Sequence, residues 1–247
     1  MQTINETTGD WRPGMYKKYS THFQTKLDEA AYRGFVPYGS YLMHSFFPKD
    51  HLIRIVDLGC GIGGFMRVFY EAGYTNIEGI DLSEESVTTA HAHGMTQVLQ
   101  GDVFQYLENA LEHSADVVIC IDILEHFRRE EALRFLALIH RVLKPGGRVL
   151  IHVPNAEGVF GSRIRYADYT HEMAYTQKSI AQVLTFSGFA SISSYEDKPL
   201  LHNITAIVRR GLWEIMTLPI RFLHLVETGS WKVRLSQNIL AVAFKSV

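Results

Sequence analysis

A glycine-rich segment that follows a short apolar run constrains the fold of this chain more than any other feature. Ile55 and Val56 lead into Asp57, after which residues 58–64 read Leu-Gly-Cys-Gly-Ile-Gly-Gly and open a stretch with helical spacing. Glycines let a backbone turn sharply and approach a ligand closely, and in a doubly wound sheet such a turn lies at the ligand crevice. The segment also fits the G-x-G-x-x-G pattern of dinucleotide-binding proteins. A nucleotide-type ligand is therefore favoured over a tight turn without one.

Strand-like and helix-like segments alternate through most of the chain. Further apolar runs lie near residues 77–81, 96–100, 115–121, 147–153 and 189–195, and helical patterns such as 129–143 and 176–187 separate them. This alternation predicts an α/β fold with a mostly parallel sheet covered by helices on both faces. We expect a single domain over 1–247, with an N-terminal helical cap or lid (14–47), a cofactor-binding core (50–195), a helical insertion (199–228) and a closing strand (236–245).

Composition excludes several classes of protein. The 247 residues carry a formal net charge of −2 without a long basic run, so a nucleic-acid partner is not expected. Cys60 and Cys120 lie far apart, which argues against a disulfide framework or a zinc site and favours a reducing cytoplasm. No apolar run is long enough for a transmembrane segment.

Acidic residues follow the next strand-like runs. Asp81 ends the second run, where a carboxylate can accept hydrogen bonds from both hydroxyls of a ribose, while Ser83 serves as the cap of the next helix. Asp102 follows the third run and either contacts an adenine amino group or only forms a turn. Asp122 follows the fourth run, and a Leu-Lys-Pro-Gly-Gly turn at 143–147 precedes the fifth.

The ordered set DLGCGIGG, GIDLS, GD, DILEH and LKPGG resembles the class I S-adenosylmethionine-dependent methyltransferase superfamily. That family has a Rossmann-like fold of seven strands, of which the last is antiparallel and lies beside the sixth. The resemblance implies S-adenosyl-L-methionine as cofactor. It also implies that the methionine part contacts Asp57, Gly59, Cys60, Gly61 and Gly63, and that the ribose contacts Asp81 and Leu82. The adenine would contact Asp102 and Val103, and Asp122 with the residues after it would line the sulfonium pocket.

A narrower resemblance lies downstream. Residues 153–157 (VPNAE) and 165–172 (RYADYTHE) are similar to methyltransferases of bacterial surface-polysaccharide clusters, although Ala167 and Tyr169 stand where many of those proteins have glycine and phenylalanine. This similarity implies capsule or lipopolysaccharide biosynthesis and a sugar or glycan acceptor. The residues expected to contact the acceptor are Asn155, Tyr166, Tyr169 and Glu172.

Two histidines compete for the role of base that a hydroxyl acceptor requires. His171 lies between Asp168 and Glu172, which could orient it; its alternative role is to anchor a loop. His126 follows Glu125 after the fourth strand, and a structural hydrogen bond is its slightly favoured role. We predict no metal, although Asp168, His171 and Glu172 could hold a divalent ion as a minor alternative.

Two apolar segments leave their role open. Residues 212–226 are apolar on nearly all faces. This segment could form a core helix, a membrane-surface patch or, as part of 199–228, a homodimer contact; burial in the fold or a dimer is favoured. Tyr16, Tyr19 and Phe23 could form a lid, although packing on the sheet is favoured. The rival functions are a small-molecule or quinone-type methyltransferase, a nicotinamide-dependent oxidoreductase and a non-catalytic binding protein.

Overall fold

A seven-stranded sheet forms the centre of the protein. The computed structural model describes residues 11–16 and 29–247. The strand order is β3-β2-β1-β4-β5-β7-β6, and only β7 runs antiparallel to its neighbours. The strands are β1 (Ile55–Leu58), β2 (Ile77–Asp81), β3 (Val98–Gln100), β4 (Ala115–Ile121), β5 (Leu143–Pro154), β6 (Ala190–Glu196) and β7 (Asn238–Phe244). The predicted fold is confirmed, including the antiparallel closing strand.

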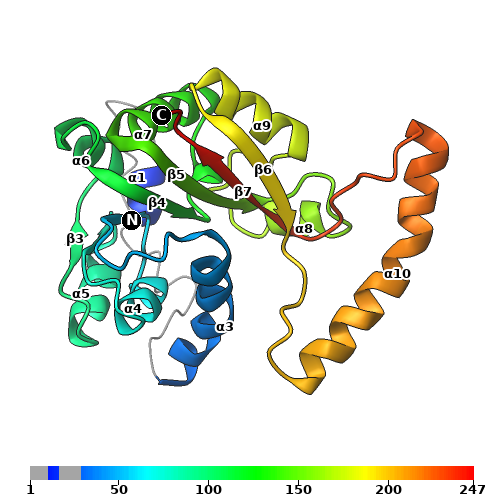
Figure 1. Cartoon of the computed structure of the whole chain (residues 1–247), viewed down its shortest axis with the longest axis horizontal. Coiled ribbons are helices and arrows are strands. Elements are labelled where there is room, and N and C mark those ends of the chain that lie inside the picture. The colour runs from blue at the N-terminus through cyan, green and yellow to red at the C-terminus, as the bar shows by residue number, and fades with distance from the viewer. Residues whose placement is uncertain (1–10, 17–28) are drawn as a thin grey trace.

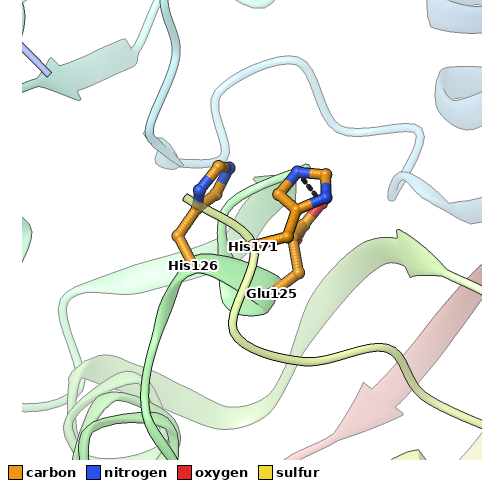
Figure 2. A group of neighbouring side chains, drawn as sticks. All are labelled: Glu125, His126 and His171. Carbon is orange, nitrogen blue, oxygen red and sulfur yellow. Dashed lines mark ion pairs between the residues drawn. The ribbon is translucent and has the colours of Figure 1, made fainter. Parts of the chain in front are cut away.

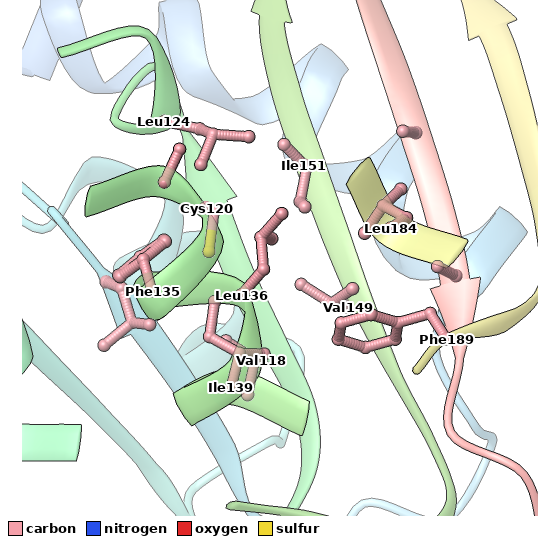
Figure 3. Packing of buried hydrophobic residues seen from close by; sticks show 14 of the residues in the cluster. Val118, Cys120, Leu124, Phe135, Leu136, Ile139, Val149, Ile151, Leu184 and Phe189 are labelled. Carbon is pink, nitrogen blue, oxygen red and sulfur yellow. The ribbon is translucent and has the colours of Figure 1, made fainter. Parts of the chain in front are cut away.

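Helices cover both faces of the sheet and close an apolar core on each side (Figure 1). One core lies under α6 (Val103–Asn109), α7 (Arg129–Val142) and α9 (Gln177–Phe186), and Figure 3 shows Leu136 of α7 between Phe135 of the same helix and Val149 of β5. The other core lies under α3 (Glu29–Phe46), α4 (Gly64–Glu71) and α5 (Glu84–Ala92). Three short helices lie near the site: α1 (Arg12–Tyr16), η1 (Leu124–His126) and α8 (Gly161–Arg165).

Side-chain caps fix where several of these helices begin. Ser83 accepts a hydrogen bond from the backbone N–H of Ser86 at the start of α5, as the sequence predicts. Thr176 and Ser179 form a reciprocal capping box at the start of α9. Because both caps follow directly on a strand or an extended segment, they set the angle at which each helix leaves the carboxyl edge of the sheet.

Some predicted boundaries shift. Strand β5 begins at Leu143 and not near residue 147, because Leu143 already pairs with Ala115; residues 144–147 then bulge out, with Gly146 at φ +77°, and pairing resumes at Arg148 and Val117. Helix α1 begins at Arg12, two residues before the predicted cap. Tyr19 and Phe23 lie outside the described residues.

The predicted insertion forms one helix, α10 (Ile204–Thr228), which stands apart from the body of the protein (Figure 1). Only Ala206 and Thr217 of this helix are buried. The expectation of a buried core helix is therefore wrong for this segment, because the helix contacts the body along a single narrow face. Within the described ranges, no helix has the length and hydropathy needed to cross a bilayer.

Candidate active site

The glycine turn between β1 and α4 is held from two sides. The backbone N–H groups of Gly59 and Cys60 both donate to the carbonyl of Ile80, with N···O distances of 2.8 and 3.2 Å. Gly59 has φ +74°, and a Cβ there would lie 2.8 Å from Cδ1 of Ile123 in the segment after β4. Gly61 has φ +54° and open space where a side chain would stand. The turn thus presents bare backbone at the carboxyl edge of the sheet.

Two carboxylates flank this turn. Asp57 is buried in β1, and burial, with a contribution from Asp81, raises its pKa to about 7. Among the described residues, no hydrogen bond to the Asp57 carboxylate lowers that pKa. Asp81 accepts hydrogen bonds from the backbone N–H of Gly61 at 2.7 Å and of Ser83 at 2.9 Å; burial still raises its pKa. Neither acid has a cation beside it in the part of the chain that the structure describes, so a positively charged ligand would be stabilised at this position.

The residues predicted to contact adenine have mixed roles. Asp102 caps α6, because one of its carboxylate oxygens accepts from the backbone N–H groups of Phe104 and Gln105 at 2.9 and 3.0 Å. Only its second oxygen remains for a ligand. Leu82 is half exposed and Val103 is buried, which suits apolar contacts on either side of a flat ring.

A buried histidine next to Asp122 escaped the sequence reasoning. Asp122 follows β4 with φ +54°, and its carboxylate lies 2.6 Å from Nδ1 of His152, whose Nε2 lies 3.3 Å from Asp197. Burial opposes a charged imidazole, but the two carboxylates outweigh it and raise the pKa of His152 well above its usual range. Burial likewise opposes the Asp122 anion, yet His152 holds the pKa of Asp122 below its usual range. The signal in the sequence that could have revealed this pair is His152 itself, a polar residue inside the buried apolar run of β5.

A second group, here called the histidine cluster, consists of Glu125, His126, Asp168, Thr170 and His171 (Figure 2 shows three of them). The hydroxyl of Thr170 donates to Asp168 at 2.7 Å and accepts from Nδ1 of His126 at 2.8 Å. Nδ1 of His171 donates to the carbonyl of Ile164 at 3.1 Å. Since both Nδ1 atoms act as donors, each histidine keeps the lone pair on Nε2.

The electrostatics of the two histidines differ. Burial, together with the neighbouring His171, lowers the pKa of His126 to about 4. Nε2 of His171 lies 4.0 Å from carboxylate oxygens of both Glu125 and Asp168. A protonated His126 would therefore be costly, and burial also raises the pKa of the Glu125 carboxyl well above its usual range, which disfavours its charged form.

The cluster also has the composition of a metal site. One ligand atom from each of Glu125, His126 and His171 lies within 4.8 Å of the others. Oε2 of Glu125 is buried and has no hydrogen-bond partner among the described residues. The structure does not bring Asp168, His171 and Glu172 together as the alternative metal site, because the Glu172 carboxylate lies 3.9 Å from Arg128 instead.

The four residues predicted to contact the acceptor separate into two kinds. The amide of Asn155 is fully buried; it donates to the carbonyls of Arg234 and Ser236 and accepts from the backbone of Glu157. This set of bonds favours a structural role over the predicted substrate contact. The aromatic rings of Tyr166 and Tyr169 are 77 % and 80 % exposed, which leaves them accessible to a ligand. The side chain of Glu172 is one-third exposed.

Comparison with known proteins identifies the family. The model of the methyltransferase domain family matches residues 32–194. The chain belongs to this family. It is 30 % identical over 109 residues to a ubiquinone biosynthesis O-methyltransferase of Pseudomonas aeruginosa, a match that covers 41 % of this chain and 44 % of that protein. The chain thus spans less than half the length of this curated relative.

Solved methyltransferases share the fold. A S-adenosylmethionine-dependent methyltransferase from Archaeoglobus fulgidus has a TM-score of 0.67 at 18 % identity, covering 92 % of this chain and 98 % of that one. Phosphoethanolamine N-methyltransferase 2 of Haemonchus contortus, solved with S-adenosyl-L-methionine, has a TM-score of 0.60 at 21 % identity, covering 85 % and 52 %. The structure of that N-methyltransferase contains S-adenosyl-L-methionine, the cofactor that the sequence resemblance implies for this chain.

The residues present fit that cofactor. Asp57, Asp81 and Asp122, here called the acidic rim, follow or end the neighbouring strands β1, β2 and β4. The contact between Gly59 and Ile123 joins the glycine turn to the segment that begins at Asp122. A ligand with an ammonium group and a sulfonium would supply positive charge to Asp57 and Asp81, which have no cation beside them among the described residues, whereas Asp122 already pairs with His152.

Proposed function

We propose that this methyltransferase O-methylates a sugar hydroxyl in the biosynthesis of a bacterial surface polysaccharide. The resemblance of residues 153–157 and 165–172 to methyltransferases of such clusters supports the acceptor class. The observation that carries the proposal is the histidine cluster, because the same segment supplies Asp168, Thr170 and His171 to it. A base of this kind is what a hydroxyl acceptor needs, since the hydroxyl must lose its proton as it is methylated.

His171 is the proposed base. When bound, S-adenosyl-L-methionine supplies an electrophilic methyl group on a sulfonium that leaves without assistance. Nε2 of His171 then accepts the hydroxyl proton, and the Asp168 carboxylate, 4.0 Å away, faces the resulting imidazolium. His126 positions the acceptor beside His171, because the hydrogen bond to Thr170 fixes its ring. The acidic rim would hold the donor.

Tyr166 and Tyr169 are proposed to contact the acceptor. Both side chains are exposed, and the Tyr169 ring lies tilted against Trp11 with ring centroids 5.1 Å apart. Aromatic side chains offer a flat apolar surface together with a hydroxyl, which suits a ligand with apolar ring faces and many hydroxyl groups.

Methyl transfer from labelled S-adenosyl-L-methionine tests the proposal. The acceptors should include nucleotide sugars and isolated surface glycans, with a catechol-type quinone precursor and phosphoethanolamine as competing classes. We expect label in a sugar methyl ether, identified by mass spectrometry after hydrolysis. Transfer only to the quinone precursor or to the amine would replace the sugar assignment while leaving the methyltransferase activity in place.

Metal binding is a second candidate role for the same cluster, favoured by the unpartnered carboxylate oxygen of Glu125. Two histidines and one carboxylate form a known ligand set for divalent transition metals. A metal there would lower the pKa of a bound hydroxyl, in place of a base. Turnover that survives dialysis against a chelator supports His171 as base, whereas loss of turnover that is restored by a divalent ion supports the metal.

A further inference from the structure

Helix α10 has its two faces reversed relative to an ordinary surface helix. Its polar side chains turn toward the body: Arg221 pairs with Glu196 at 2.8 Å, and Glu214 bonds to Lys198 and Arg210 at 2.9 Å each. Its large apolar side chains turn outward, with exposures from 37 % to 81 %. They are Ile204, Ile207, Val208, Leu212, Ile215, Met216, Leu218, Ile220, Phe222, Leu223 and Val226.

The apolar face is too large to be an incidental surface feature. A helix of 25 residues is about 37 Å long, and these eleven side chains expose on the order of 1,000 Å². The largest patch on a typical monomer is about 300–600 Å², whereas a stable interface buries about 800 Å² on each partner. The outward face of α10 therefore has the area that one partner surface of a stable complex requires.

Charge placement indicates which partner fits this face. Arg209 and Glu227 are the exposed charged residues of α10, and each lies near one end of the helix. They are separated by about five helical turns, so they lie on the same flank of the apolar face. If two copies of α10 pack antiparallel with their centre at Leu218, Arg209 of each copy comes opposite Glu227 of the other. A two-fold axis produces this pairing twice.

We propose that α10 is the interface of an antiparallel homodimer centred at Leu218. The inference does not depend on which acceptor is methylated. A membrane surface fits the same helix less well, because membrane-bound amphipathic helices present free Lys and Arg to the lipid headgroups. Here Arg210 and Arg221 face the body and are engaged by Glu214 and Glu196.

The mass of the full-length protein in solution is the first test. Sedimentation velocity with light scattering should give about twice the 28.1 kDa of one chain at micromolar concentration. Ile215→Lys places a charge in the middle of the apolar face and should weaken dimerisation at least 10-fold. Leu111→Lys is the matched control, since Leu111 is 78 % exposed outside α10, and it should leave the dimer unchanged.

Charge reversal tests the antiparallel register. Arg209→Glu and Glu227→Arg should each weaken the dimer by roughly 10-fold, because each single change sets two like-charged pairs across the two-fold axis. The double variant should return to within twofold of the native dissociation constant. Lys178→Glu, on the exposed surface of α9, controls for the change in net charge. All these positions are exposed, and circular dichroism checks that each variant folds.

Three outcomes would overturn the proposal. A monomer at every accessible concentration excludes the dimer. A monomer that floats with phosphatidylcholine–phosphatidylglycerol vesicles, and loses flotation in Ile215→Lys, assigns the face to a membrane surface. A dimer whose charge-reversed double variant is no stronger than the single variants excludes the antiparallel register. Binding of S-adenosylhomocysteine should stay within twofold in every variant, which separates these outcomes from failure of the methyltransferase site.

Discussion

On the cofactor side of the site, Asp57, Gly61 and Asp81 lie on two adjacent strands and the turn that follows the first of them. On the acceptor side, His126 and His171 come from distant segments that meet only in the folded chain. Asp57 and Asp81 of the acidic rim have no cation beside them among the described residues, whereas the two rings of the histidine cluster are held by hydrogen bonds to Thr170 and Ile164. The first is suited to hold a positively charged donor, and the second to take a proton. Changes on the two sides should therefore affect different measurements.

Removal of the proposed base should have the largest effect. His171→Ala should lower kcat by about 10²- to 10⁴-fold, because the hydroxyl proton would then have no acceptor near the reacting oxygen. The dissociation constant for S-adenosylhomocysteine, measured by calorimetry, should stay within twofold. His202→Ala is a control outside the site. If His171→Ala turns over within fivefold of the native enzyme, His171 is not the base.

Asp57 should make stability depend on pH. Its pKa is about 7 in the folded chain and 3.8 in the reference state, so the folded state holds the proton more tightly. Stability should therefore fall as the pH rises from about 4 to 7, by on the order of 2–4 kcal/mol, and remain low above that. Asp57→Asn should remove this fall and be more stable than the native chain at pH 8.

Urea unfolding at several pH values, without cofactor, measures the effect. The same Asp57→Asn variant should bind S-adenosylhomocysteine more weakly, because the amide offers no negative charge to the ammonium group. Equal pH slopes in the native and variant chains would show that the buried carboxylate does not carry this penalty.

The sequence alone indicates that the glycine turn, Asp57 and Asp81 lie close together, because the determinants of their positions are local. The glycine turn and Asp81 each follow directly on a strand, and parallel strands bring their carboxyl ends to one edge. The acceptor side was predicted only in part. His126 and His171 were both named, but their contact, the bond from Thr170 to Asp168 and the role of His152 depend on tertiary packing. Asn155 shows another limit: the resemblance implied a substrate contact, whereas its side-chain amide forms hydrogen bonds to Arg234, Ser236 and Glu157 of the chain itself.

Helix α10 illustrates a different limit. Its composition predicted a helix correctly, but an apolar helix can be covered by its own domain or by another molecule. Sequence spacing gives the faces of a helix and not what covers them. The paired charges of Arg210, Glu214 and Arg221 show which face of α10 lies against the body of the protein, since they belong to its polar face.

A substitution at Asp81 tests the cofactor side of the site separately from the acceptor side. Asp81→Ala removes the hydrogen bonds to Gly61 and Ser83 and the charge at the predicted ribose position. We expect the dissociation constant of S-adenosylhomocysteine to rise about 10- to 100-fold, since a hydrogen bond to a charged group contributes about 1.5–3 kcal/mol. Because kcat at saturating cofactor should fall less than fivefold, Asp81→Ala is the converse of His171→Ala. Asp50→Ala, in a loop before β1, is the control.

The smallest effect should come from Thr170, which touches the reaction only through His126. Thr170→Val keeps the shape of the side chain but removes the hydroxyl that accepts from Nδ1 of His126 and donates to Asp168. The loss of orientation should lower kcat about 5- to 20-fold with an unchanged dissociation constant for the cofactor. Thr170→Ser, which retains the hydroxyl, should recover most of the activity. If the valine and serine variants lose activity equally, the buried site responds to packing, and the hydrogen bond from His126 has no part in positioning the acceptor.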